Sequence, residues 1–445
     1  MISHLIRLTR FSLAIESIEC QQVNPPRDLR ARVPWARSGS GRLNHPQLNH
    51  KRRSFKSTTE VLVELGRIKV QKVPFVGSSH RVLSREKLAS GSENHHQTGF
   101  ESKAEPTIWK PMVFCLSLTA IGFGLAVDLT NRDTAQKVNY LREHQGSFPN
   151  WFSKSLFNQR MEPIPSDAQL QQLRKLERLN SIKRLGLNHV LPHQILTWYI
   201  NLGEGQQVCL VLGLVNLAVF SAWQMPRMIG YMSNHFTHHP LSGKSYTLLS
   251  STFSHSTLLH FGFNMLALYS IGSTAHDSLT HRLRASRDVD PVRIPESTPT
   301  YHFLAFYLFA GLAAGMGSHA LSLLIRAPRL IKWRQGVLKS STPPIPILPS
   351  LGASGAIYGC LTMTALAFPE AHVSLIFLPW IPIKIGNAVF FAVMLDFIGV
   401  IRSWRHFDHM AHLCGGLAGL IWYFSIDKWF DRIRLRYWKL YKNKE

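Results

Sequence analysis

Four polar residues lie in or beside apolar stretches of this sequence, and as a group they could carry out nucleophilic chemistry. Ser354 stands between glycines in the stretch 351–359, and His412 lies near the start of a later apolar run. A serine hydroxyl becomes a good nucleophile when a base removes its proton, and histidine is the usual base. His260 and Asn264 are four residues apart and therefore share a helix face. Together with the backbone N–H of Ser354, they could donate hydrogen bonds to a developing oxyanion.

Glycine pairs are spaced so that the helices bearing the serine and the histidine could approach closely. Gly355 and Gly359 form one GxxxG pattern, and Gly415 and Gly419 form another. In membrane helices such small residues let two backbones come almost into contact. We therefore expect the serine helix to pack against the histidine helix, which would bring the imidazole within hydrogen-bond reach of the hydroxyl.

Further residues belong to the predicted site through their positions. Tyr358 is four residues after Ser354 and shares its helix face, while Gly352 and Gly355 leave the backbone beside the serine free of bulky side chains. Each of these also suits ordinary helix packing. Asp396 lies inside another apolar run, where a charged residue is costly. We expect its carboxylate to be a buried hydrogen-bond partner for another helix.

The composition indicates a membrane protein. The 445 residues are 45% hydrophobic, and 50 Lys and Arg against 26 Asp and Glu give a formal net charge of +24. These basic residues gather at the N-terminus, in connections and in the tail, not on one module with a groove-reading motif, so we expect no nucleic-acid partner. Basic flanks around apolar runs are typical of membrane proteins.

The first 60 residues predict a mitochondrial transit peptide. They are rich in arginine and serine and poor in acidic residues, and their apolar stretches are too short for the core of a secretory signal. A disordered basic arm is the alternative for residues 1–60. Residues 61–108 are polar and mixed, and we expect a linker or a second processed region there.

Seven apolar runs predict membrane-spanning helices in an all-α protein. A helix needs about 20 residues to cross a bilayer, and the first run, 109–128, has roughly that length. The other spans are expected at 208–223, 248–271, 301–325, 354–368, 386–401 and 410–426. Only helices and closed barrels satisfy their backbone polar groups in lipid, so these runs predict a helical bundle.

The segments between the spans differ in character. Residues 129–205 are polar, and the leucines between 166 and 187 predict an amphipathic helix that lies on the membrane face, on the protein or free in water. Residues 371–384 are apolar but interrupted by prolines, which indicates an interfacial loop. A basic tail, 428–445, closes the sequence.

Histidine clusters leave a membrane di-iron desaturase or hydroxylase as an alternative interpretation. The stretch 234–239 contains the pattern HxxHH, and His406, His409 and His412 follow at intervals of three. Histidine is the commonest metal ligand, but a second HxxHH box and an HxxxH box are missing, and the later histidines do not all share one helix face. The five cysteines form no CxxC pair. We therefore expect neither a metal nor a cofactor.

Six stretches, in order, resemble the rhomboid intramembrane serine proteases, most closely their mitochondrial presenilin-associated rhomboid-like branch. The stretches are 249–255, 260–265, 350–357, 376–379, 386–388 and 407–413. The glycine–serine motif and the Ala411–His412 pair are specific in combination. The resemblance implies a rhomboid protease core over residues 206–427, which is a six-helix bundle, with one extra N-terminal transmembrane helix (1+6). It also implies a location in the mitochondrial inner membrane.

The resemblance implies a role for each residue of the predicted site. Ser354 would be the nucleophile, and His412 would be the general base and acid. His260 and Asn264 would complete the oxyanion hole. Tyr358 matches the ring on which the histidine packs in some members of the family.

The implied partners are the lipid bilayer and transmembrane protein substrates. Family substrates are single-span proteins with helix-destabilising residues near the cut, and in mitochondria they include dynamin-like GTPases and imported kinases or peroxidases of the inner membrane. A catalytically inactive rhomboid-like binding protein is a further alternative. Such proteins lack the serine or the histidine, and this chain has both, which favours an enzyme.

Three features of the sequence are not part of the usual family pattern. The family uses a serine–histidine dyad, yet Asp408 lies four residues before the histidine and could orient it. Cys414 stands where close relatives often have glycine, a small change that we expect to be tolerated. The connections 276–300 and 326–349 are longer than expected, so they leave the local topology open.

Overall fold

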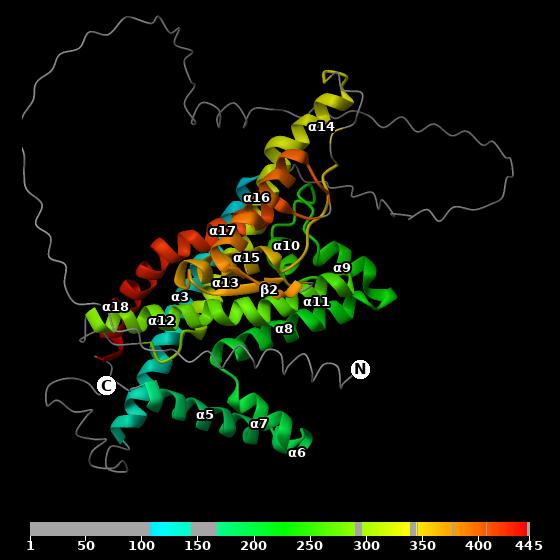
Figure 1. The fold of residues 1–445 in the computed structure, drawn as a ribbon. Coiled ribbons are helices and arrows are strands. Elements are labelled where there is room, and N and C mark those ends of the chain that lie inside the picture. Colours follow the sequence, from blue (N-terminus) through cyan, green and yellow to red (C-terminus); the bar gives the residue numbers. More distant parts are fainter. Residues whose placement is uncertain are drawn as a thin grey trace, which may run out of the picture. The chain divides into compact units, whose positions relative to one another are not determined.

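The fold was analysed in a computed structural model of the chain (Figure 1). The structure describes residues 107–143, 167–289, 296–338, 344, 346–375, 378–405 and 407–442. The predicted transit peptide and nearly all of the predicted linker lie outside these residues. His406 also lies outside them, as do parts of the segments 129–205, 276–300 and 326–349.

Helices make up most of the described residues. The long helices are α3 (Trp109–Glu143), α8 (Glu204–Trp223), α11 (Leu258–Ala267), α12 (Ser273–Val289), α13 (Thr300–Leu321), α15 (Ser354–Ala367), α16 (Ile385–Arg402), α17 (His409–Ile421) and α18 (Asp427–Lys442). The other helices are α5 (Asp167–Arg184), α6 (Leu187–Val190), α7 (His193–Asn201), α9 (Ile229–His235), α10 (Thr247–Ser250) and α14 (Ala327–Arg334). Single π-helical turns join α11 to α12, α13 to α14 and α17 to α18, so each pair forms one continuous run.

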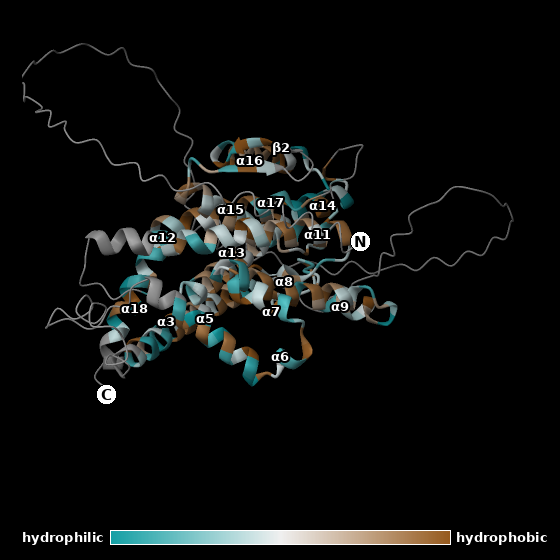
Figure 2. Cartoon of the chain, turned by 60° about the horizontal axis from the view of Figure 1, so that its bottom comes forward, coloured by the Kyte–Doolittle hydropathy of each residue, from teal (hydrophilic) through white to brown (hydrophobic). Residues whose placement is uncertain are grey.

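Four of the described helical runs are long and apolar enough to cross a membrane. They are Trp109–Tyr140, Glu204–Trp223, Thr300–Arg334 and Ile385–Arg402, and α15 is a shorter apolar helix. Large apolar side chains are exposed on these helices, including Leu116 of α3 at 63%, Phe390 of α16 at 60% and Phe391 of α16 at 65%. Figure 2 shows the hydrophobic residues spread along these helices. Such surfaces suit contact with lipid tails, which confirms a multi-pass membrane protein.

The predicted start of the third span is wrong. The chain forms α10 and a 3-10 turn over residues 247–253, then becomes extended at Ser254 before α11 begins at Leu258. Hydroxyl groups explain the break, because the Thr252 hydroxyl donates to the Leu248 carbonyl at 3.1 Å, and Ser254 accepts from the indole of Trp223 at 2.7 Å. His255 therefore lies before the helix and not within it.

Several helices continue past their predicted ends. The run that begins with α11 reaches Val289, the run that begins with α13 reaches Arg334, and the run that begins with α17 reaches Lys442, so part of the predicted basic tail is helical. The first helix likewise extends to Glu143. Its polar half is supported by ion pairs one helical turn apart, from Arg132 to Asp128 at 2.8 Å and from Lys137 to Asp133 at 2.7 Å.

Residues 371–384, predicted as an interfacial loop, form a two-stranded antiparallel hairpin where they are described. Strand β1 (His372–Leu375) pairs with β2 (Leu378–Lys384), with His372 opposite Lys384 and Ser374 opposite Pro382. A two-stranded hairpin has free edges, which is where a proline is tolerated within a sheet. As predicted, this segment does not form a membrane-crossing helix.

The centre of the fold is the contact of α15 with α17, against which α13 packs. The predicted close approach is confirmed. A Cβ atom at Gly415 would collide with the carbonyl of Gly355, and one at Gly419 would collide with the carbonyl of Gly359. The two GxxxG patterns therefore face each other, and only the absence of side chains allows this spacing.

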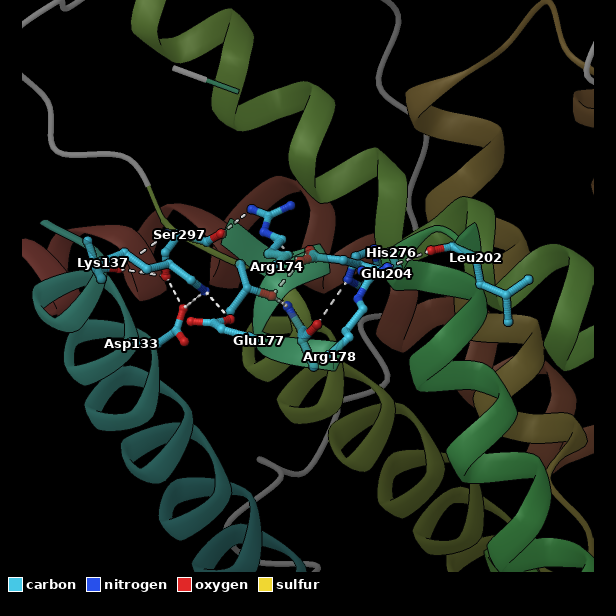
Figure 3. A network of polar contacts seen from close by, with 12 residues as sticks. Asp133, Lys137, Arg174, Glu177, Arg178, Leu202, Glu204, His276 and Ser297 are labelled. Carbon is cyan, nitrogen blue, oxygen red and sulfur yellow. Dashed lines mark hydrogen bonds and ion pairs between the residues drawn. The ribbon is translucent and has the colours of Figure 1, made fainter. Parts of the chain in front are cut away.

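Polar side chains fix α5 to the protein (Figure 3). Arg174 of α5 pairs with Glu204 at the start of α8 at 2.6 Å, and Arg178 donates to the carbonyls of Ile200 and Leu202, both at 2.9 Å. Lys137 of α3 lies 3.6 Å from Glu177. Helix α5 thus occupies most of the segment predicted as an amphipathic helix, and its polar residues contact α3 and α8.

The glycine contact gives a direct stability prediction. We expect Gly415→Ala to lower the free energy of unfolding by about 1–3 kcal/mol or more, because the added methyl group meets backbone that cannot rotate away. Thermal unfolding of the protein in detergent micelles measures this. Gly124→Ala in α3 is the matched control, because its Cβ would meet nothing within 4 Å. An unfolding temperature of Gly415→Ala as high as that of Gly124→Ala would contradict the predicted seam.

Candidate active site

The nucleophile candidate and the base candidate contact each other across the α15–α17 seam. Ser354 is the first residue of α15, and its Oγ lies 2.8 Å from Nε2 of His412, which is in the first turn of α17. His412 is 8% exposed. The structure therefore brings together two residues 58 positions apart in the sequence, in the geometry that activation of a serine requires.

The second ring nitrogen of His412 contacts a buried carboxylate. Nδ1 of His412 lies 3.1 Å from Oδ1 of Asp396, on α16, and Asp396 is 3% exposed. The same oxygen lies 2.6 Å from Nδ1 of His409. A carboxylate at Nδ1 fixes the tautomer that leaves Nε2 free to accept the serine proton. The expectation that Asp396 partners another helix is confirmed.

Asp408, the residue expected to orient His412, has a different contact. It is the N-cap of α17, and its side chain accepts from the backbone N–H of Ala411 at 3.2 Å and from the Ser318 hydroxyl at 2.6 Å. Helix capping occupies this carboxylate, because the four first N–H groups of a helix lack partners within it. The expectation for Asp408 is therefore wrong, and Asp396 takes that place.

The ring of Tyr358 stacks on the histidine. The two ring centres are 4.3 Å apart and the planes differ by 10°. Tyr358 lies one helical turn after Ser354, so the same face of α15 presents the hydroxyl and the ring. This contact keeps the imidazole ring from tilting out of the plane in which it stacks on Tyr358.

The turn before Ser354 is built around Gly352. Its φ angle is 131°, which side chains rarely allow, and a Cβ atom there would lie 2.8 Å from Cε1 of the His260 ring. The Gly352 N–H donates to the carbonyl of Ser251 at 2.9 Å. The Ala353 N–H donates to Nε2 of His255 at 3.3 Å, a contact that sequence reasoning missed. Its only signal was the position of His255 within the 249–255 stretch.

His260 and Asn264 line the same cavity as Ser354. The cavity has a volume of about 610 Å³ and is also lined by Phe263, Phe407 and other residues of α11, α13 and α17. The side-chain amide of Asn264 donates to the carbonyl of His260 at 2.8 Å. The structure thus places both predicted oxyanion donors at the site, with Asn264 engaged within its own helix.

The histidines of the metal interpretation are divided among separate contacts. His238 lies 3.0 Å from His319, and His235 lies 2.7 Å from the Tyr246 hydroxyl. His409 and His412 share Asp396. Among the residues that the structure describes, no three His, Cys, Asp or Glu side chains are grouped as metal ligands would be. The donors in the described part of the chain are therefore not arranged as the ligands of a di-iron site would be.

Comparison with known proteins shows what the part of the chain around this site resembles. Residues 242–428 match the model of the rhomboid domain. The human presenilin-associated rhomboid-like protein, mitochondrial, is 32% identical over 231 residues, which are 52% of this chain and 51% of the human protein. Rhomboid protein 1, mitochondrial, of Saccharomyces cerevisiae is 29% identical over 227 residues, 50% of this chain and 54% of the yeast protein. RHOMBOID-like protein 12, mitochondrial, of Arabidopsis thaliana is 24% identical over 252 residues, covering 56% and 64% of the two chains.

The chain spans about half the length of the human and yeast relatives that it matches. The domain match includes α10 to α17 and therefore Ser354, Asp396 and His412, together with both helices of the glycine seam. Residues 242–428, which hold the candidate site, are therefore similar to the rhomboid domain.

Proposed function

We propose that the chain is an intramembrane serine endopeptidase. The observation that carries this proposal is the 2.8 Å contact between Ser354 Oγ and His412 Nε2 inside an apolar helical bundle. The similarity of residues 242–428 to the rhomboid domain supports the reaction class. The substrate would be a peptide bond within or beside a transmembrane helix.

The proposed reaction has two halves. Ser354 Oγ attacks the scissile carbonyl carbon while His412 Nε2 takes the hydroxyl proton, and His412 then gives that proton to the leaving amine as the C–N bond breaks. An acyl-enzyme ester on Ser354 remains. A water molecule, deprotonated by the same imidazole, attacks the ester and restores the serine. The carboxylate of Asp396 stabilises the imidazolium that forms in each half.

The oxyanion would be stabilised at the start of α15. The N–H of Ser354 belongs to the first turn of the helix, where backbone donors lack partners within the helix. His260 and Asn264 lie beside it, and Asn264 would exchange its present bond to the His260 carbonyl for a bond to the oxyanion. Gly352 and Gly355 would support the site by allowing the close backbone geometry there.

The proposal also covers the membrane in which the protein lies and the substrates that it would cleave. Relatives named as mitochondrial support a mitochondrial membrane, and we propose the inner membrane, with residues 1–60 as the transit peptide. The helices support an arrangement of one N-terminal span, α3, followed by a core over residues 206–427. Substrates would be single-span proteins of that membrane, such as dynamin-like GTPases or imported proteins.

Cleavage by purified protein tests the proposed activity. In proteoliposomes containing a single-span substrate, we expect Ser354→Ala to lower cleavage by about a thousandfold or more, because the nucleophile is gone. Ser221→Ala removes a hydroxyl of α8 that donates to the carbonyl of Leu217, and this variant should cleave normally. A chelator should have no effect. Cleavage retained by Ser354→Ala, or abolished by the chelator, would refute the serine-protease proposal, and binding without cleavage by the unaltered chain would favour the inactive binding protein.

A second prediction concerns the role of Asp396. We expect Asp396→Asn to lower kcat by about 10²–10⁴ with little change in KM, since it removes the charge that stabilises the imidazolium. Asp408→Asn is the matched control, because asparagine caps helices as well as aspartate does, so kcat should stay near that of the unaltered chain. Equal kcat values for the two variants would contradict the assignment. Thermal unfolding of both variants checks that folding is unchanged.

A third prediction concerns the oxyanion. We expect Asn264→Ala to lower kcat by about 10–10³ with KM little changed, because its donor would act on charge that develops only in the transition state. Ser270→Ala, two turns further along the same helical run and bonded to the carbonyl of Leu266, is the control. A rise in KM with kcat unchanged would instead assign Asn264 to substrate binding.

A further inference from the structure

The α5–α7 hairpin exposes an unusual number of apolar side chains. These are Leu176 at 44%, Leu179 at 38%, Leu185 at 72%, Val190 at 76%, Leu191 at 36%, Ile195 at 46% and Trp198 at 48% exposed. None of the nine residues of α7 is buried. Figure 2 shows hydrophobic stretches along this hairpin, which lies outside the candidate spans. Apolar side chains gathered in this way mark a surface that something other than water covers.

The hairpin directs polar groups toward the protein. The ion pair of Arg174 with Glu204, at 2.6 Å, joins α5 to the start of α8 (Figure 3). Arg178 donates to the carbonyls of Ile200, within α7, and of Leu202, just after α7. In water, a helix docked on a protein normally buries its leucines and exposes its charges. Ion pairs join α5 to α3 and α8, and although Ile182 of α5 is buried, Leu176 and Leu179 are exposed. This arrangement suits apolar surroundings outside the hairpin.

The position of the hairpin identifies those surroundings as the lipid bilayer. Helix α7 leads through Leu202 and Gly203 directly into α8, a candidate span. The exposed apolar residues of α8 include Val211 at 52% and Leu214 at 55%, which in a membrane face lipid tails. The two carbonyls bound by Arg178 lie at this junction, so they hold the hairpin at the place where α8 enters the membrane.

Charge and aromatic residues of the hairpin fit the headgroup region. Lys183 and Arg184 occupy the last turn of α5, are both exposed, and directly precede Leu185. Exposed Trp198 lies in α7, and tryptophan is enriched at the boundary of a membrane. Basic residues beside apolar ones bind anionic lipid surfaces through both charge and insertion.

We propose that the α5–α7 hairpin is an interfacial membrane anchor. Leu185, Val190, Ile195 and Trp198 insert among the acyl chains, and Lys183 with Arg184 binds anionic lipid headgroups. The anchor braces the entry of α8 and the polar half of α3 from the membrane surface. This inference concerns a surface away from Ser354, and its test does not depend on cleavage.

Depth measurements on the full chain test the anchor. The five native cysteines are replaced, and one cysteine is introduced at Val190, Val211 or Glu370 for a fluorescent label, with the protein in vesicles of phosphatidylcholine and anionic phosphatidylglycerol. Val211 reports the lipid face of α8, and Glu370, whose side chain is 82% exposed, reports water. We expect lipids brominated in the acyl chains to quench the labels at 190 and 211 strongly, and aqueous iodide to quench only the label at 370.

Other outcomes overturn the anchor in distinguishable ways. If iodide quenches the label at 190 while brominated lipid quenches the label at 211, the hairpin lies in water and only the placement of α8 in the membrane is supported. If neither agent quenches the label at 190, another protein or a second copy covers the hairpin. If brominated lipid fails to quench the label at 211, the membrane arrangement itself is wrong.

A charge variant tests the headgroup contact. For the label at 190, we expect less quenching by brominated lipid when Lys183→Ser and Arg184→Ser are combined, and the same loss when the vesicles contain phosphatidylcholine alone. The matched control combines Lys332→Ser and Arg334→Ser, which removes two exposed cations of α14 and should leave the quenching unchanged. Equal quenching in all four cases would contradict binding of anionic headgroups.

Discussion

The backbone contact between α15 and α17 is the constraint on which the candidate site depends. Because Gly355 and Gly359 face Gly415 and Gly419 without side chains between them, the helices lie close enough for the serine hydroxyl to reach the imidazole. Neither helix contributes a long polar side chain to bridge a wider gap. The distance of 2.8 Å is thus a consequence of helix packing and not of loop conformation.

Around that contact, each element limits one motion of the site. Stacking on Tyr358 fixes the plane of the His412 ring, and the carboxylate of Asp396 fixes which ring nitrogen carries a proton. The left-handed turn at Gly352 sets the start of α15 against His260. A site held in this way is preorganised for the charge that would appear during the proposed reaction, and such preorganisation is a large source of rate in many enzymes.

Much of this arrangement could be predicted from residue types and spacing, because GxxxG patterns and polar residues inside apolar runs act locally. The pairing of Asp396 with His412 could not be predicted, because the connection between α16 and α17 does not fix how one helix is rotated against the other. Asp408 was suggested as a residue that could orient the histidine only because it is one turn away, whereas the helix start needed it as a cap. The late start of α11 arose from hydroxyl side chains that bond nearby backbone and side-chain groups. The exposure of Leu176 and Leu179 on α5 depends on how α5 contacts α3 and α8, which no local pattern reveals.

The most direct test of the account is to identify the residue that reacts with a fluorophosphonate, a reagent that phosphonylates activated serines. Mass spectrometry of peptides from the labelled, membrane-reconstituted protein would locate the adduct. The account predicts a single adduct on Ser354 that disappears in His412→Ala, because the hydroxyl is nucleophilic only beside the imidazole. An adduct on another residue, or labelling of Ser354 that persists without His412, would contradict it.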